Sequence, residues 1–568
     1  MTTDKTSKHQ HPWQASYAPG VHWPFEPSPR AAWQLLEDAV SQYTARPCLN
    51  FMGKIHTYAE VWEQVLQVAQ GLQEMGIGKG DRIGLCLPNC PYFVIAYFGA
   101  LRAGATVVNF NPLYTEKEIS RQISDSGVKL MFTLDLKIIF NKVHAALGKT
   151  PLQHIVVCPL ADALPKLQSI LLRVFKFYEL AHPEPQPQLQ TFSQLTSKGN
   201  MPASVHVDPA KDVALIQYTG GTTGLPKGAM LSHRNVVANT EQIRLWLNDL
   251  NPDGEKFICV LPFFHVFAMT VTQNMALMTG SELILLPRFE LKQLLKTIHK
   301  TRATLFVGVP TIYNAINNSP LSNKYDLSSI RYCVSGGAGL PQQVKEGFEK
   351  RTGCVLVEGY GLSEASPVVS CNPLHTGGKI NSIGIPLPGT EARIIDLDNP
   401  KKILPTGEKG ELVVRGPQVM LGYWNRDKET SDTFQDGWLR TGDVGHMDED
   451  GFIFLTDRMK EIINCSGFKV YPRTVEEALY LHPAIAEALV IGVPHPYKGE
   501  APKGFVTLKP GTHATVEELM HFATSHLNPI ERPVAIEIRT SLPKTLVGKL
   551  SRKDLAEEEA RKHENTTK

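Results

Sequence analysis

The chain is organised around the stretch Tyr218-Thr219-Gly220-Gly221-Thr222-Thr223-Gly224-Leu225-Pro226-Lys227-Gly228. Residues 213–218, Val-Ala-Leu-Ile-Gln-Tyr, are apolar enough to predict a short buried strand directly before it. Ser232 is a good N-cap for a helix that runs through Asn235, Val236 and Leu245. We therefore expect a glycine-rich loop between a strand and a helix.

The composition of this loop favours phosphate binding. Its three glycines within five residues allow several backbone N–H groups to point at one spot, and such a nest binds phosphate oxygens. Thr219, Thr222 and Thr223 add hydroxyl donors, and Lys227 adds a positive charge. The stretch is not the Walker pattern, which requires Lys-Ser/Thr after the last glycine. The alternative is a Gly/Thr turn on the surface.

Length and composition bound the class of protein. A chain of 568 residues is too long for one ordinary core, so two or more domains are expected. With 42% hydrophobic and 20% charged residues the chain is globular, and a net charge of +2 gives no sign of nucleic acid binding.

Cysteine usage and apolar runs indicate a cytoplasmic protein. The nine cysteines are an odd number without a CxxC pair, which argues for reduced thiols and against a zinc site or a disulfide framework. The N-terminus has no apolar signal region, and no run of about eighteen apolar residues occurs that would span a membrane.

Strands alternate with helices along most of the chain, which predicts an α/β fold with a parallel or mixed sheet. Thr57 and Glu60 have the spacing of a capping box before a helix. Its apolar stripe consists of Val61, Val65, Val68, Ala69 and Leu72. Buried strands are predicted at residues 82–87, 106–110, 129–133 and 154–158 before the loop, and at 257–261, 282–286, 304–309, 330–335 and 354–358 after it.

The texture changes towards the C-terminus. Residues 383–454 contain short strands and Gly/Asp turns, which indicate a small β subdomain. A compact α/β unit is predicted after Asp457. We expect residues 1–28 to form a loose arm and the charged tail from Asp554 to be frayed.

Residues 165–182 form a basic amphipathic pattern. Leu167, Ile170, Leu171, Val174, Phe175 and Tyr178 recur at helical spacing, with Lys166, Arg173 and Lys176 nearby. Such a helix either docks its apolar face on its own domain, as amphipathic helices usually do, or lies on an anionic membrane surface. The first alternative is the expected one.

The glycine-rich loop resembles the signature of the adenylate-forming enzymes, also called the AMP-binding or acyl-CoA synthetase/luciferase superfamily. Further motifs match this family in the expected order, and together they span most of residues 57–553. The resemblance implies a large N-terminal α/β domain, residues 1–456, with stacked mixed sheets and a small β subdomain. A small mobile C-terminal α+β domain, residues 457–568, would follow, with its hinge at Asp457.

Two strand-loop motifs carry the implied nucleotide site. By resemblance, the small residues after residues 332–335 let adenine approach the backbone; they are Gly336, Gly337 and Ala338. The second motif comprises Glu358, Gly359, Tyr360, Gly361, Ser363 and Glu364. Tyr360 offers an aromatic face for adenine, and Ser363, where the family usually has Thr, a hydroxyl for the α-phosphate.

The resemblance also implies the metal and ribose contacts. Mg²⁺ on the ATP phosphates would be held by Glu364, a hard carboxylate, with Thr222 and Thr223. Asp443 would accept both ribose hydroxyls. Arg458 would reach the ribose or a phosphate, and Lys460 would lie close to the adenylate. Standing alone, a loop Glu or a Thr-Gly-Asp turn would more often be solvated.

Three further assignments come from the resemblance. Lys549, in Leu542-Pro543-Lys544-Thr545-Leu546-Val547-Gly548-Lys549, would hold the carboxylate and the α-phosphate together during adenylation. His265 would form a wall between the acyl pocket and the adenylate, and it is equally readable as a buried, hydrogen-bonded histidine. The coenzyme A channel would use Ser466, Gly467, Phe468 and Lys469.

The chain looks most like bacterial medium- and long-chain fatty acid–CoA ligases, which implies ATP-dependent formation of acyl-CoA through an acyl-adenylate. The segment 266–278 and the helix after Pro310 would line the acyl tunnel. Glu531-Arg532-Pro533 departs from the family's usual Tyr-Lys-x-Pro, which leaves coenzyme A contacts there open. Alternatives are a dicarboxylate–CoA ligase and an enzyme that delivers to a carrier-protein thiol. Monomer and homodimer both stay open.

Overall fold

A computed structural model describes residues 11–197, 201–219, 226–375, 377–466, 468–545 and 548–566. The strand before the glycine-rich loop forms as predicted, as β8 (Val213–Thr219). The loop does not lead directly into the helix. It joins β8 to an antiparallel strand, β9 (Lys227–Ser232), and α9 (His233–Trp246) begins only after Ser232, which caps it through Asn235. The predicted strand–loop–helix order was therefore wrong, because the additional strand β9 lies between the loop and the helix.

β8 and β9 belong to an eight-stranded mixed sheet. The neighbouring strands from β8 through β4, β3, β5 and β6 to β7 are parallel, whereas β9 runs antiparallel between β8 and β19. In order across the sheet, its strands are β19 (Gly422–Tyr423), β9, β8, β4 (Thr106–Asn109), β3 (Arg82–Cys86), β5 (Leu130–Leu134), β6 (His154–Cys158) and β7 (Leu189–Thr191).

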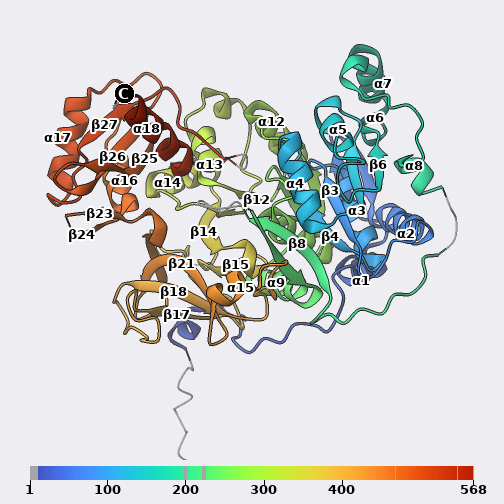
Figure 1. Cartoon of the computed structure of the whole chain (residues 1–568), viewed down its shortest axis with the longest axis horizontal. Helices are drawn as coiled ribbons and strands as arrows, with labels where there is room; N and C mark the ends of the chain where they lie inside the picture. The colour runs from blue at the N-terminus through green and yellow to red at the C-terminus, as the bar shows by residue number, and fades with distance from the viewer. Residues whose placement is uncertain are drawn as a thin grey trace, which may run out of the picture.

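A nine-stranded mixed sheet lies beside it (Figure 1). Its central strands are parallel and mostly buried, as expected where helices cover both faces. In order, they are β16 (Ile385–Pro386), β15 (Val368–Cys371), β14 (Val355–Gly361), β13 (Tyr332–Ser335), β12 (Leu305–Gly308), β10 (Lys256–Cys259), β11 (Glu282–Leu285), β1 (Pro47–Phe51) and β2 (Lys54–Thr57). The mixed α/β architecture predicted from the sequence is confirmed.

Helices pack around these two sheets. The predicted capping box forms at Thr57 and Glu60, and the apolar stripe of α2 is fully buried. The other α-helices before residue 440 are α1 (Gln34–Tyr43), α3 (Pro91–Arg102), α4 (Glu116–Ser126), α5 (Lys137–His144), α6 (Leu160–Ala163), α7 (Lys166–Phe175), α8 (Phe192–Leu195), α10 (Val266–Ala268), α11 (Met275–Met278), α12 (Leu291–Thr301), α13 (Pro310–Asn317), α14 (Gln342–Thr352) and α15 (Asp427–Thr433); α2 is Tyr58–Glu74.

A small antiparallel sheet follows, as the Gly/Asp-rich texture predicted. Its strands are β17 (Glu391–Ile395), β18 (Gly410–Arg415), β21 (Trp438–Met447), β20 (Phe434–Gln435) and β22 (Ile453–Arg458). β22 pairs with β21 through Asp443 and Arg458. The last strand of this sheet therefore contains Asp457, the predicted hinge residue.

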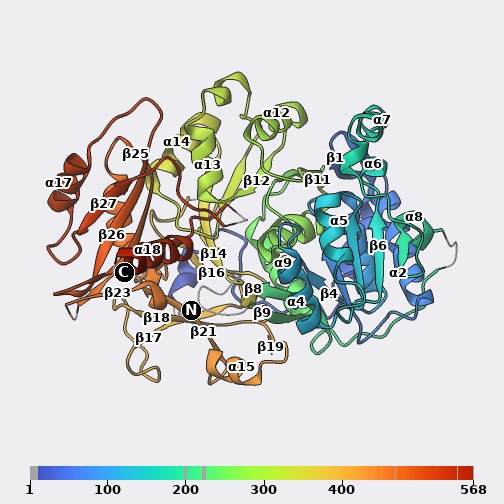
Figure 2. The same ribbon diagram turned by 45° about the horizontal axis from the view of Figure 1, so that its top comes forward.

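The C-terminal part has its own sheet and cores (Figure 2). The large hydrophobic core extends to Ile453, and two separate clusters begin with Ile463 and Leu489. Its elements are β23 (Ile463–Cys465), β24 (Phe468–Val470), α16 (Pro472–Tyr480), β25 (Ile485–His495), β26 (Gly499–Leu508), α17 (Val516–His526), β27 (Ala535–Ile538) and α18 (Arg552–Thr566).

Two predictions about the ends of the chain were wrong. Residues 11–28 are not loose, because Trp13 is buried and its ring packs against those of His11 and Trp23. The charged tail is not frayed over its described part. Leu555 and Glu559 of α18 are buried, and Glu559 accepts from Lys503 at 2.6 Å. A charged helix with one apolar contact gives little periodic signal in the sequence.

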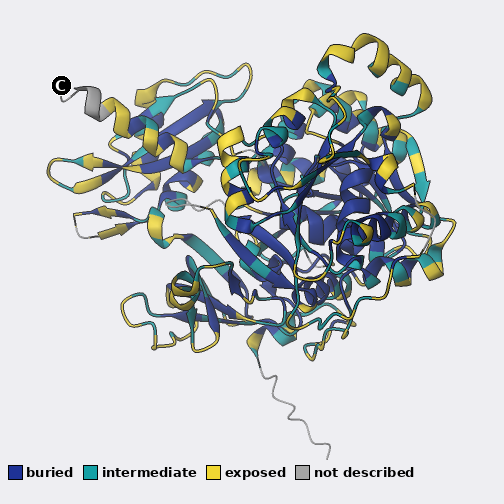
Figure 3. Cartoon of the chain, turned by 45° about the vertical axis from the view of Figure 1, so that its right-hand side comes forward, coloured by how far each residue is buried: buried dark blue, intermediate teal, exposed yellow. Residues whose placement is uncertain are grey.

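The expected docking of residues 165–182 on their own domain was also wrong. α7 has no buried residue, and its large apolar side chains are exposed. It projects from the upper right of Figure 1 and is largely yellow in Figure 3. Within the described residues no helix is long and apolar enough to cross a membrane. All nine cysteines are buried and free.

Candidate active site

A large cavity opens where the loops after β12, β13 and β14 meet the C-terminal part. Its volume is about 1610 Å³, above the ~300–1,000 Å³ usual for small-molecule pockets, so it has room for two joined ligands. The described predicted site residues that line it are Thr219, Lys227, His265, Gly336, Gly337, Ala338, Glu358, Gly359, Tyr360, Gly361, Ser363, Glu364, Asp443, Arg458, Lys460 and Lys549.

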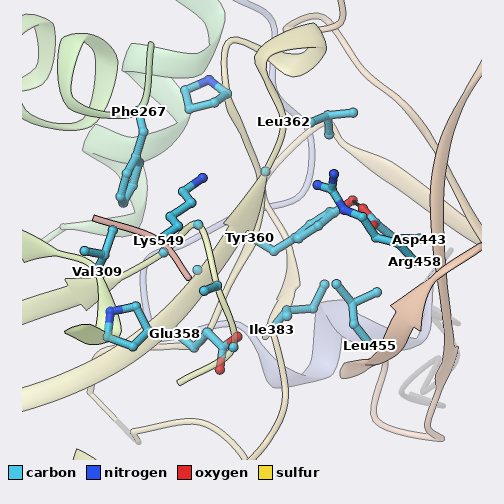
Figure 4. Close-up of a pocket in the computed structure, with 18 of the residues that line it drawn as sticks. Phe267, Val309, Glu358, Tyr360, Leu362, Ile383, Asp443, Leu455, Arg458 and Lys549 are labelled. Atoms are coloured by element: carbon cyan, nitrogen blue, oxygen red, sulfur yellow. Dashed lines mark hydrogen bonds and ion pairs between the residues drawn. The ribbon is translucent and has the colours of Figure 1, made fainter. Parts of the chain in front are cut away.

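The loop after β13 depends on its glycines. Gly337 has φ +80°, a left-handed conformation, and a Cβ built on it would collide with Cε of Lys549. A Cβ on Gly336 would lie 2.8 Å from Cζ of Phe267. The absence of a side chain at Gly337 therefore makes room for the Lys549 side chain, which Figure 4 shows in the cavity.

Tyr360, Asp443 and Arg458 form one group, which Figure 4 shows at the other side of the cavity. The Tyr360 hydroxyl donates to Oδ2 of Asp443, and Nε of Arg458 lies 3.2 Å from Oδ1. Burial raises the pKa of Asp443, and Arg458 opposes this rise. β14, β21 and β22 thus bring together the three residues predicted to hold adenine and ribose.

Glu364, the residue predicted to bind the metal, lines the cavity. It is part of a short helix, η5 (Ser363–Ala365), and its Oε1 accepts from the Tyr423 hydroxyl at 2.7 Å. Nζ of Lys227 lies 5.0 Å from the centre of the Tyr423 ring. Tyr423 was missed from the sequence, because it lies on β19, far along the chain from both groups.

Lys549 enters the cavity from the C-terminal part. Its turn is held by Thr545 N–H donating to the Lys549 carbonyl at 2.6 Å, and by the Thr311 hydroxyl donating to the Gly548 carbonyl at 2.7 Å. Burial, and secondly Arg458, lower the pKa of Lys549 to about 8. Among the described residues no carboxylate forms an ion pair with Lys549, and a partly desolvated ammonium of this kind is suited to binding an anion.

His265 is neutral in this environment. Burial, and secondly Lys549, lower the pKa of His265 to about 3. Its Nδ1 accepts from the Phe267 N–H at 3.4 Å, which caps α10. Both interpretations of His265 are therefore compatible with the structure: it is hydrogen-bonded, and it lines the cavity beside Lys549.

A charged cluster surrounds residue 457. The Asp457 carboxylate accepts from the Arg473 N–H at 2.8 Å and lies 3.3 Å from Nη1 of Arg552. Arg552 also binds Glu476 at 2.7 Å and contacts Glu461. These contacts hold the start of the C-terminal part against its own helices.

Arg473 is a second residue that sequence reasoning missed. A Cβ on Gly339 would lie 2.7 Å from its Cζ, so the guanidinium packs directly on the loop after β13. Burial raises the pKa of Glu358 to about 7, while Arg473 and the Leu340 N–H oppose the rise. Nothing in the sequence around Arg473 distinguishes it from an ordinary helix-start residue.

The predicted coenzyme A residues lie elsewhere. Ser466, Phe468 and Lys469, on the β23–β24 hairpin, are exposed and do not line the cavity. Gly467 lies outside the described residues, as do Gly220, Gly221, Thr222, Thr223 and Gly224 of the glycine-rich loop.

Part of the cavity lining is apolar. It includes Ile243, Trp246, Leu247, Leu374, Ile383 and Leu387. Of the predicted tunnel segments, residues 266–278 contribute Phe267 and Val271, and α13 contributes Pro310, Thr311 and Asn314. The sequence prediction thus found part of the lining and missed the contribution of α9.

Comparisons with known proteins agree with this geometry. The AMP-binding enzyme model matches residues 36–424, and the AMP-binding enzyme C-terminal domain model matches residues 474–549. The fold is that of the adenylate-forming class of enzymes. The chain belongs to the AMP-binding enzyme family.

Similar proteins include two bacterial enzymes. A long-chain-fatty-acid–CoA ligase of Bacillus subtilis is 44% identical over 98% of this chain and 99% of its own. One of Salmonella typhimurium is 38% identical over 94% and 95%. The crystal structure of ATP-bound MatB from Rhodopseudomonas palustris matches with a TM-score of 0.81 and 27% identity, over 93% and 99% of the two chains.

Proposed function

We propose that the chain activates a medium- or long-chain fatty acid to acyl-CoA, with ATP, Mg²⁺ and coenzyme A, and releases AMP and pyrophosphate. The observation that carries this proposal is the position of Lys549, an ammonium lying against the loop of Gly337 in the same cavity as the Tyr360–Asp443–Arg458 group. The similarity to the bacterial ligases over nearly the full length supports the choice of substrates.

The first half-reaction needs two anions brought together. A carboxylate oxygen bonds to the α-phosphorus of ATP while the bond to the β-phosphate breaks and pyrophosphate leaves. The Lys549 ammonium lies between the two anions and offsets their repulsion, which stabilises the charge of the transition state. Tyr360 and Asp443 hold adenine and ribose, and their fixed positions align the α-phosphorus for attack.

Mg²⁺ would be held by Glu364 together with the phosphates. The fit is good, because the carboxylate is a hard oxygen ligand, fixed through one oxygen by Tyr423, and Mg²⁺ in such sites takes its other ligands from phosphates and water. This agrees with the finding that the described residues hold no cluster of three or more His, Cys, Asp or Glu suited to a metal. A bound ion would neutralise charge on the leaving pyrophosphate.

The second half-reaction transfers the acyl group. The thiol sulfur of coenzyme A bonds to the acyl carbonyl carbon, and AMP leaves. The residues assigned to coenzyme A, Ser466, Phe468 and Lys469, are exposed on the hairpin, so the proposal requires the C-terminal part, residues 457–568, to turn relative to residues 1–456 about Asp457. This turn would withdraw Lys549 and act as a gate between the two steps.

The acyl chain would lie against apolar residues of the cavity lining. The side chains of Trp246, Leu247 and Leu387 can cover methylene groups and offer no cation to a second carboxylate. This favours a monocarboxylic acid over the dicarboxylate alternative. The enzyme would work in the cytoplasm with peripheral contact to the inner membrane surface, where free fatty acids partition.

Mass spectrometry tests the proposal. The pure protein is incubated with MgATP, coenzyme A and an equimolar panel of linear mono- and dicarboxylic acids. Acyl-CoA of monocarboxylic chains is the expected product. Formation of acyl-AMP without thioester would mean that the acceptor is a thiol other than coenzyme A. Formation of dicarboxylyl-CoA would mean that the substrate is a dicarboxylic acid. Absence of any product with every acid would overturn the proposed function.

A further inference from the structure

α7 and the short helix after it, η2 (Phe177–Glu179), present apolar side chains to solvent. Leu167, Ile170, Val174, Phe175, Phe177 and Tyr178 are each between 59% and 70% exposed. We call these six residues the α7 patch. Scattered exposed apolar residues are ordinary, but a contiguous group on one helix marks an interaction site.

The helix faces its domain with the side that carries Gln168, Ser169 and Leu172. Nε2 of Gln168 donates to the Met52 carbonyl at 3.4 Å, and Ser169 and Leu172 are the less exposed residues of α7. On a helical projection these three lie opposite Ile170 and Val174. The usual arrangement, in which the apolar side of an amphipathic helix faces the core, is therefore reversed at this one helix.

Cations follow one flank of the patch. Lys166 and Arg173 lie on adjacent positions of the helical projection, at the edge of the apolar face, and Lys176 directly follows the last residue of α7. Arg173 pairs with Asp162 at 2.5 Å and Lys176 with Glu179 at 3.0 Å, and both pairs are more than one-third exposed. Exposed pairs of this kind are weak, so the cations can exchange these partners for other anions.

We infer that the α7 patch docks the protein on an anionic lipid surface, with the helix lying in the plane of the interface. An apolar face with aromatic side chains, flanked by Lys and Arg, is the arrangement that binds bilayer surfaces. A second copy of the chain is the less favourable occupant, because two facing patches would bring their cationic flanks together. The inference deepens the membrane contact of the proposed function and rests on it for its biological setting.

The test measures binding of the full chain to vesicles of phosphatidylcholine with phosphatidylglycerol, by flotation without ATP or fatty acid. The wild type should float with these vesicles and bind pure phosphatidylcholine more weakly. The double variant Ile170→Gln/Phe175→Gln should bind at least about tenfold more weakly, since it places two polar amides in the apolar face. Both residues are exposed, so the thermal midpoint should not change.

A matched control separates the patch from general hydrophobicity. Phe289→Gln/Ile403→Gln removes the same two residue types from exposed positions elsewhere and should bind as the wild type does. Equal binding of the patch variant and the wild type would overturn the inference. So would a wild-type dimer that the patch variant converts to a monomer in light scattering, because the patch would then be an interface between copies.

The ligase reaction with a short, soluble acid such as octanoate distinguishes this outcome from failure of the proposed function. The patch variant should form octanoyl-CoA at the wild-type rate without vesicles. A wild-type protein that forms octanoyl-CoA but does not bind the vesicles would overturn the docking surface alone. A wild-type protein that binds the vesicles but forms no octanoyl-CoA would support the docking surface and contradict the proposed reaction.

Discussion

Lys549 and Lys469 belong to the same C-terminal part and are assigned to the same overall reaction, yet their surroundings differ. Lys549 lies in the cavity against Gly337, and its pKa is lowered to about 8. Lys469 is exposed on the β23–β24 hairpin and does not line the cavity. One arrangement of the two parts therefore serves one half-reaction, and substitutions in the two regions should separate the two steps.

The largest effect is expected for Lys549→Ala. Adenylation, measured as exchange of pyrophosphate into ATP with a fatty acid present, should fall by about 10²–10³-fold, the usual cost of removing one preorganised charge-stabilising group. Thioester formation from synthetic acyl-adenylate should be unchanged. Lys544→Ala is the control, because Lys544 does not itself line the cavity and pairs with Glu487 at 2.6 Å. If Lys549→Ala lowers both half-reactions equally, the cavity lysine and the hairpin do not serve separate half-reactions.

Gly337→Ala should also act on adenylation. The added methyl group meets Lys549, and the left-handed backbone at φ +80° disfavours alanine. Strain of ~1–3 kcal/mol corresponds to a loss of about 5–150-fold. Gly353→Ala is a matched control with φ +76° and open space around the new methyl group. If both variants lose adenylation equally, backbone strain alone explains the effect and the contact with Lys549 does not matter.

The hairpin should show the opposite selectivity. Phe468→Ala and Lys469→Ala should each lower thioester formation by about tenfold, the loss of a contact worth ~1.4 kcal/mol, and leave adenylation as it is. Both side chains are exposed, so stability should not change. Single-turnover assays of the two half-reactions provide the measurement. A loss of adenylation in either variant would mean that the hairpin acts in the arrangement described here.

The smallest effect concerns pH. Because the ammonium form of Lys549 is the active one, it is populated below its pKa and lost as the pH rises through about 8. The kcat/KM for ATP in adenylation should therefore fall by about tenfold per unit above that pH, since this parameter reports the free enzyme. The variant Lys549→Arg should not show this fall in kcat/KM above about pH 8, even if its rate is low. If the same fall persists in that variant, the pH dependence belongs to another group.

Much of the fold could be predicted from the sequence, because local signals and burial agree there. The capping box at Thr57, the buried stripe of α2 and strands such as β6 follow from residue type and spacing alone. β9 was missed because its residues, Lys227–Ser232, were taken as part of the approach to the helix, and their pairing with β8 is fixed across the loop.

The exposure of α7 could not be predicted, for a physical reason. The amphipathic pattern of residues 166–175 is the same whether its apolar face meets a core or solvent, and only the contacts of Gln168 and its neighbours decide. The pairing of Glu364 with Tyr423 and the packing of Arg473 on Gly339 likewise depend on how distant segments assemble. The family motifs predicted the site residues, but only the folded arrangement of the chain shows which of these residues lie in contact.

The central claim is that one cavity serves adenylation first and thioester formation second. The most direct test separates these two steps in time. The protein is mixed with MgATP and a long-chain fatty acid in the absence of coenzyme A, and the products are followed by quenched-flow mass spectrometry before and after coenzyme A is added. The expected result is bound acyl-AMP with one equivalent of pyrophosphate first, and conversion to acyl-CoA and AMP only on the addition. Release of ADP and phosphate, or no pyrophosphate until coenzyme A is present, would contradict the account.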